Sequence, residues 1–191
     1  MFETLVIDDF LNSHEQEVVR SNLLQRAKWN LIIDMDGKDE AKYPSFGFVH
    51  VFKHPSEGIT SEFYQAVIDL FVPKIKEKAK IDVKDVYYTR SFLQVPLEAK
   101  FHKERNNVHV DIPQKHIAAV YYVTDSDGDT VIYDNVYGEN VTTLKRHQTV
   151  TPKAGRMVLF DGSRYHCSSQ PNNALRCIIN MDLIVDVAAL G

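Results

Sequence analysis

The chain has 191 residues, of which 44% are hydrophobic and 25% charged, a composition typical of a globular domain. Its net charge of −4 argues against a broad nucleic-acid-binding surface, and no apolar run approaches the roughly 18 residues of a membrane span. The first residues lack the basic region of a secretory signal, so we expect one cytoplasmic domain over residues 1–191. The only two cysteines, Cys167 and Cys177, are interpreted as packing residues.

The first half of the chain predicts a helical layer, mainly over residues 12–80. A short strand within residues 2–11 leads into a helix, with Asn12 or Ser13 as N-cap and a capping box from Ser13 to Gln16. Apolar residues then repeat at helical spacing to about residue 28. A second helix is expected from about Thr60 to Lys80, kinked at Pro73. The segments between the helices are interpreted as a strand, a polar turn and a second strand, at 29–33, 34–39 and 46–53.

The second half of the chain, over residues 86–186, predicts a β-core. Short β-rich runs separated by turn residues lie at 86–95, 117–123, 130–133, 141–150, 156–160 and 175–185. This pattern is typical of an antiparallel sandwich or jelly roll and not of alternating strand–helix units. Because the helices precede the strands, we expect a mainly β (α+β) fold with the helices packed on one outer face of the β-core.

Two residues of the β-core could bind a metal together. In an extended strand, His109 and Asp111 point to the same face, and they supply two-thirds of the 2-His-1-carboxylate set that holds non-haem Fe(II). His102 and Glu104 form a rival pair with the same spacing. That pair lies among charged and amide side chains that a barrel interior would not accept, so we do not expect it to bind the metal.

Four further residues extend this candidate site. His166 follows a turn and is the candidate third ligand. Arg176, Ile178 and Asn180 share one face of the last strand, opposite a wholly apolar face. An arginine on that face points into the barrel and needs an anion there. Asn180 either lines the pocket or bonds a neighbouring strand, and Tyr122 is either a ligand-binding residue or a core tyrosine.

With these residues, the chain resembles the Fe(II)/2-oxoglutarate-dependent dioxygenase superfamily, particularly its prolyl-4-hydroxylase-like branch. The resemblance rests on the opening VIDDFL and its helix, on His109-x-Asp111, on the segment from Pro152 to Phe160, on His166 and on Arg176. It implies a double-stranded β-helix (cupin-like jelly roll) with iron held by His109, Asp111 and His166. It also implies that Arg176, helped by Tyr122, binds the distal carboxylate of 2-oxoglutarate.

The chain departs from this family pattern at two places, Asp127 to Thr130 and Lys100 to Asn107. Both border the substrate side in the family, so they leave the substrate class open.

The resemblance implies a hydroxylase that acts on a C–H bond of a peptidyl residue, such as proline, or of a small molecule. Its cofactor would be Fe(II), its co-substrates 2-oxoglutarate and O₂, and ascorbate a further candidate. The alternative is a cupin-like metal- or sugar-binding β-barrel without oxygenase activity. A nucleic-acid demethylase is disfavoured by the acidic net charge. The oligomeric state is left open.

Overall fold

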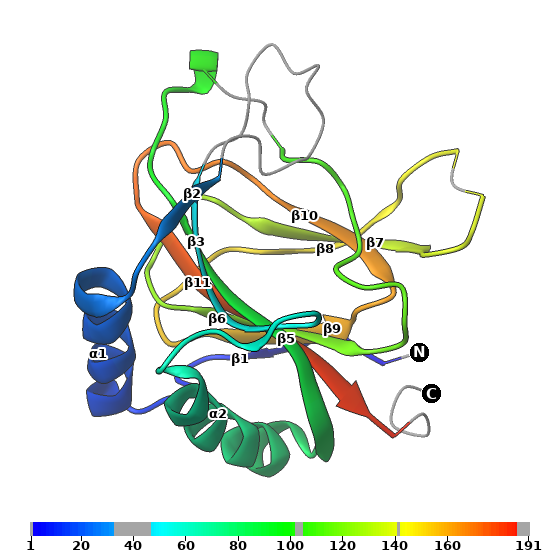
Figure 1. The fold of residues 1–191 in the computed structure, drawn as a ribbon. Helices are drawn as coiled ribbons and strands as arrows, with labels where there is room; N and C mark the ends of the chain where they lie inside the picture. The colour runs from blue at the N-terminus through cyan, green and yellow to red at the C-terminus, as the bar shows by residue number, and fades with distance from the viewer. Residues whose placement is uncertain (1, 33–46, 102–104, 141, 187–191) are drawn as a thin grey trace.

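The computed structural model describes residues 2–32, 47–101, 105–140 and 142–186, and its strands form two antiparallel sheets (Figure 1). The large sheet has the order β1-β9-β6-β11-β5-β3-β2, with β4 paired to β3. Its strands are Leu5–Ile7 (β1), Asn30–Ile32 (β2), Gly47–His54 (β3), Gly58–Ile59 (β4), Val83–Gln94 (β5), Ile117–Tyr122 (β6), Met157–Asp161 (β9) and Arg176–Val185 (β11). The small sheet, in the order β10-β7-β8, consists of Arg164–Ser168, Thr130–Val136 and Arg146–Val150.

The two sheets enclose an inner apolar core that is separate from a second core on the outer face of the large sheet. The inner core combines Val120, Phe160 and Ile178 of the large sheet with Ile132 and Val150 of the small sheet. Alternate side chains of β11, from Cys177 to Leu183, point the other way into the outer core. The fold is therefore mainly β, and the predicted jelly roll is confirmed.

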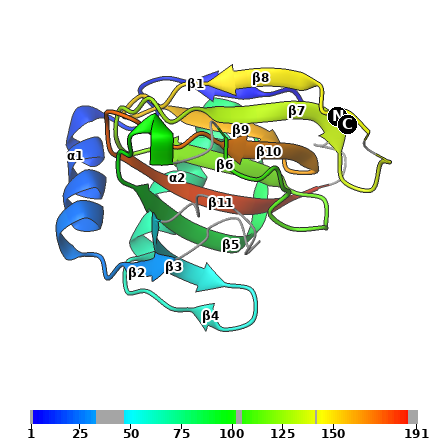
Figure 2. The same cartoon turned by 90° about the horizontal axis from the view of Figure 1, so that it is seen from above.

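The helices cover the outer face of the large sheet. The helix α1 (Ser13–Ser21) continues into a short π-helical segment, η1 (Asn22–Arg26), and α2 spans Tyr64–Ala79. Figure 1 shows α1 and α2 on the side away from β7, β8 and β10, and Figure 2 shows α2 behind the strands. The helix α2 contributes Val67, Phe71 and Ile75 to the outer core. The predicted helical layer on one outer face is confirmed.

Some local details differ from the sequence prediction. The capping box at the start of α1 pairs Asn12 with Glu15, and not Ser13 with Gln16, because the Asn12 side chain accepts the Glu15 amide. The strands β4 and β10 were not predicted, and α2 begins at Tyr64 and not near Thr60. The expected polar turn at 34–39 lies outside the described residues. The remaining predicted β-runs each contain a strand, and both cysteines are buried free thiols, as expected. None of the described helices combines the length and apolar character needed to cross a membrane.

The register of the large sheet places the inward-facing residues that concern the site. Arg90 of β5 pairs directly with Asn180 of β11, and Gln94 pairs with Arg176. Because side chains alternate along a strand, Arg176, Asn180 and Asp182 all lie on the inner face of β11. A row of polar side chains therefore runs along the space between the sheets.

Candidate metal centre

The backbone brings the two histidines together. His109 lies in the segment between the 3₁₀ turn η2 (Ala99–Phe101) and β6, and it forms an isolated antiparallel bridge with His166 of β10. Each amide donates to the carbonyl of the other residue, at 3.0 and 2.9 Å. Asp111 follows in a bend beyond this bridge. The strand expected at His109 is thus a single bridge, and Asp111 lies outside any β-ladder.

The side chains of His109, Asp111 and His166 offer ligand atoms that all lie within 4.8 Å of one another. The carboxylate oxygens of Asp111 lie 3.6 Å from Nε2 of His109 and 3.3 Å from Nε2 of His166. The side chains of Asp111 and His166 are buried, whereas that of His109 is 52% exposed. Three donors on one side and an open approach on the other suit a divalent metal that also binds exogenous ligands.

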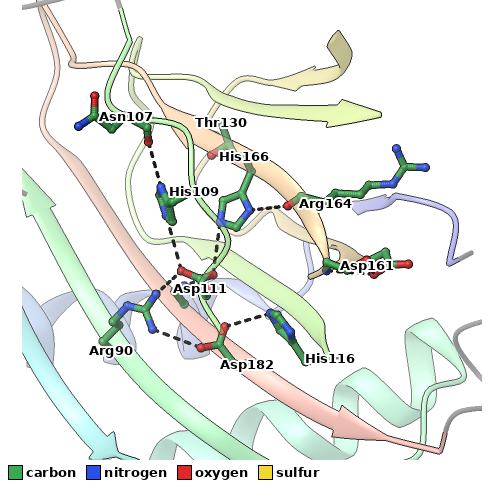
Figure 3. Close-up of polar contacts among 12 residues, drawn as sticks. Arg90, Asn107, His109, Asp111, His116, Thr130, Asp161, Arg164, His166 and Asp182 are labelled. Carbon is green, nitrogen blue, oxygen red and sulfur yellow. Dashed lines mark hydrogen bonds and ion pairs between the residues drawn. The ribbon is translucent and has the colours of Figure 1, made fainter. Parts of the chain in front are cut away.

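Backbone carbonyls orient both imidazoles. Nδ1 of His109 is bonded to the carbonyl of Asn107 at 3.0 Å, and Nδ1 of His166 to that of Arg164 at 3.1 Å (Figure 3). A carbonyl only accepts, so each Nδ1 carries a proton, and Nε2, on the side facing Asp111, is the ring nitrogen available to a metal. This outer hydrogen bond is typical of metal-binding histidines.

The Asp111 carboxylate receives a donor on each oxygen. Arg90 pairs with Oδ1, and Nδ2 of Asn180 donates to Oδ2 at 3.1 Å. Burial opposes ionisation of Asp111, but the Arg90 guanidinium and the nearby His166 hold its pKa well below the usual range. Asp111 is therefore a carboxylate at neutral pH, as metal binding requires.

A second buried carboxylate, that of Asp182, lies close to the three candidate ligands. Arg90 also bonds Oδ2 of Asp182 at 3.3 Å, and Oδ1 of Asp182 faces Nε2 of His116 at 3.8 Å (Figure 3). Burial, followed by repulsion from Asp111, raises the pKa of Asp182 to about 7. Asp111, His116 and Asp182 also come within metal-ligand range of one another. The Arg90 guanidinium already bridges the two carboxylates as a cation, which disfavours a second metal there.

Arg176 lines the same cavity as the three candidate ligands. This cavity of about 110 Å³ has room for several water-sized groups and is lined by the three candidate ligands together with Arg90, Thr130, Arg176 and Asn180. Arg176 is 3% exposed and donates to Gly128 O, Gln94 Oε1 and Thr130 Oγ1 at 2.8–3.1 Å. Within the described residues no carboxylate pairs with it, and two of its five N–H donors remain for a ligand.

Of the two remaining predicted site residues, Asn180 lines the cavity and Tyr122 does not. Asn180 lines the cavity, and its Oδ1 has no hydrogen-bond partner among the described residues. Tyr122 is not among the residues that line the cavity. Its buried hydroxyl donates instead to Thr130 Oγ1 at 2.8 Å. It reaches Arg176 only through Thr130. Burial raises the pKa of Tyr122 to about 12, so it stays a neutral donor.

Sequence reasoning assigned no specific role to Arg90, His116 or Asp182. The available signal was a charged residue within an apolar strand, as at Asp182, and an arginine between Tyr88 and Phe92 on one strand face. His102 and Glu104, the rival pair, lie outside the described residues.

The chain matches no family model and no curated protein sequence. Solved structures do match it. A 2OG-Fe(II) oxygenase family protein from Burkholderia pseudomallei has a TM-score of 0.68 and 11% identity, over 94% of this chain and 84% of that one. The α-ketoglutarate-dependent epimerase SnoN of nogalamycin biosynthesis has a TM-score of 0.65 and 10% identity, over 95% and 78%. A Pseudomonas putida prolyl-4-hydroxylase has a TM-score of 0.57 and 14% identity, over 96% and 92%. The chain therefore has the fold of the 2-oxoglutarate/Fe(II) oxygenases.

Proposed function

We propose that the protein is an Fe(II)- and 2-oxoglutarate-dependent dioxygenase. In this proposal, His109, Asp111 and His166 hold Fe(II), and Arg176 binds the distal carboxylate of 2-oxoglutarate. The observation that carries it is Arg176, a buried cation that lacks a carboxylate partner among the described residues and lines the same cavity as the three candidate ligands. A buried, uncompensated charge costs several kcal/mol, at least about 3, so an anionic ligand is the natural partner.

The residues present fit both groups. Two neutral imidazoles and one ionised carboxylate are the donor set of non-haem Fe(II) oxygenases. The planar guanidinium of Arg176 presents parallel N–H groups to a carboxylate, while Thr130 and Gln94 hold its orientation. When bound, Fe(II) and 2-oxoglutarate supply O₂-dependent oxidation of a C–H bond. The Tyr122 hydroxyl donates a hydrogen bond to Thr130, and the Asn180 side-chain amide lines the cavity and donates to Asp111.

The proposed reaction is hydroxylation of a peptidyl residue, such as proline, or of a small molecule. The likeness to a prolyl-4-hydroxylase supports the first substrate, and the likeness to an epimerase of nogalamycin biosynthesis supports the second. Ascorbate is a candidate reductant that would keep the iron ferrous. We further propose that the protein acts in the cytoplasm.

A stepwise binding experiment tests this proposal. Under anaerobic conditions, Fe(II) or Co(II) is titrated into the metal-free protein, and 2-oxoglutarate is then added. We expect metal binding first, then saturable 2-oxoglutarate binding that needs Arg176, and 2-oxoglutarate decarboxylation once air is admitted. A protein that binds the metal but neither binds nor consumes 2-oxoglutarate would favour the cupin-like alternative.

A further inference from the structure

Asp111 is positioned by side chains and not by the sheet. The reciprocal backbone bonds end at His109 and His166, two residues before Asp111. Beyond that bridge the chain bends, so no β-ladder determines where the carboxylate points. Its two oxygens are held by Arg90 and Asn180, which face each other on β5 and β11. One cross-strand pair therefore holds both oxygens of one carboxylate.

Arg90 is itself immobilised from several sides. Its guanidinium lies 4.1 Å from the ring centre of Tyr88 and 5.4 Å from that of Phe92, the residues two positions before and after it on the same strand face. Its second arm bonds the fully buried Asp182 at 3.3 Å. A side chain held by two rings and a second carboxylate has lost its rotamer freedom, so it can fix a neighbour's orientation.

We propose that Arg90 and Asn180 are positioning residues that keep the Asp111 carboxylate turned toward His109 and His166, and that Asp182 anchors Arg90 for this task. This inference rests on the proposed function, because it assumes that Asp111 is a metal ligand. Residues that orient a ligand from outside contribute about 10- to 100-fold to metal affinity. The side chains of Arg90 and Asn180 would supply that factor without donating an atom to the metal.

The test is Co(II) binding to the purified 191-residue protein, measured by competition with a chelator at fixed pH. Arg90→Gln and Asn180→Ala should each weaken Co(II) affinity by about 10- to 100-fold. Arg90→Lys should recover part of the loss, since an ammonium restores the charge but not the two-armed fork. The matched control is Arg156→Gln, which removes the Arg156–Asp8 ion pair, neither residue of which lines the cavity, and should leave Co(II) affinity unchanged.

Substitutions at Asp182 test whether Arg90 needs only a hydrogen-bond acceptor at this position or a negative charge. Asp182→Asn keeps an acceptor for Arg90 and should retain near-normal Co(II) affinity, whereas Asp182→Ala should resemble Arg90→Gln. The visible spectrum of the Co(II)-saturated protein is a second readout, because the ligand field reports the arrangement of the donors. A positioning role changes the spectrum of Arg90→Gln at saturation. A merely destabilising effect leaves that spectrum unchanged.

The outcomes distinguish this inference from the proposed function. If His109→Ala and His166→Ala bind Co(II) as tightly as the wild type, the metal centre itself is refuted, and the inference with it. If those variants lose Co(II) but Arg90→Gln and Asn180→Ala do not, only the positioning role is overturned. An Asp182→Asn variant as weak as Asp182→Ala would also overturn it.

Discussion

Arg176 offers the sharpest separation of 2-oxoglutarate binding from metal binding. Replacing it with Gln removes the one buried cation that lines the cavity without a carboxylate partner in the described part of the chain. Loss of one partner of a buried, charge-assisted pair costs about 2–5 kcal/mol. The dissociation constant of 2-oxoglutarate should therefore rise by roughly 30- to 4,000-fold. Co(II) affinity should change little, because Arg176 bonds Gly128, Gln94 and Thr130 and none of the metal-ligand candidates.

The assay is calorimetric titration of 2-oxoglutarate into the Co(II)-loaded protein without O₂. A second perturbation reaches the same side chain without removing it. A Cβ added at Gly128 would lie 2.8 Å from Cδ of Arg176 and 2.9 Å from the Ser169 carbonyl, so Gly128→Ala should displace the guanidinium and also weaken 2-oxoglutarate binding. Arg176→Lys should bind better than Arg176→Gln. Wild-type 2-oxoglutarate affinity in Arg176→Gln would refute this reasoning.

Three further predictions concern stability. Gly162→Ala should destabilise the fold by at least about 1–3 kcal/mol in urea unfolding, because the new Cβ overlaps the fully buried His116 ring; an unchanged midpoint would contradict this. The Arg156 guanidinium lowers the pKa of Asp8 from 3.8 to about 2, so this exposed pair, worth below about 1 kcal/mol, stabilises the fold fully above about pH 4 and is lost as the pH falls toward 2. Asp8→Asn should therefore lower the Tm near neutral pH, with a deficit that closes between about pH 4 and 2. Lys80 ends α2 at φ 60°, so Lys80→Gly should raise stability by up to about 1 kcal/mol, and a lower Tm would refute that.

The sequence was sufficient for the architecture because the relevant patterns are local. Alternation along the β-runs separated the two faces of each strand, and it placed Cys177 to Leu183 on the outer face of β11, where the structure has them. The grouping of His109 with Asp111 was also a local prediction. It identified the right neighbours for a partly wrong reason, since only His109 belongs to a bridge and Asp111 lies in a bend.

The residues around Asp111 could not be predicted in the same way, because they depend on strand register. Arg90 and Asp182 are separated by 92 positions, and they meet only because β5 and β11 pair along most of their lengths. No single-sequence pattern specifies that pairing. The position of His116 could not be predicted for the same reason, since it comes close to Asp182 only because β6 pairs with β11, with Ala118 opposite Asp182.

The bridge between His109 and His166 joins two of the candidate ligands through their backbones, so both are affected when this part of the structure opens locally. Asn106 adds two more bonds to the same edge of β10, from its amide to Ser168 O at 2.9 Å and from its side chain to Ser168 Oγ at 2.8 Å. Separating this segment from β10 would separate the two imidazoles and release any ion they share. By linkage, a metal at 100 times its Kd would make this local opening about 100-fold rarer, or about 2.7 kcal/mol more costly. Hydrogen exchange at the His109 and His166 amides should therefore slow as metal occupancy rises. The exchange rates of these two amides would report how much of the protein holds metal.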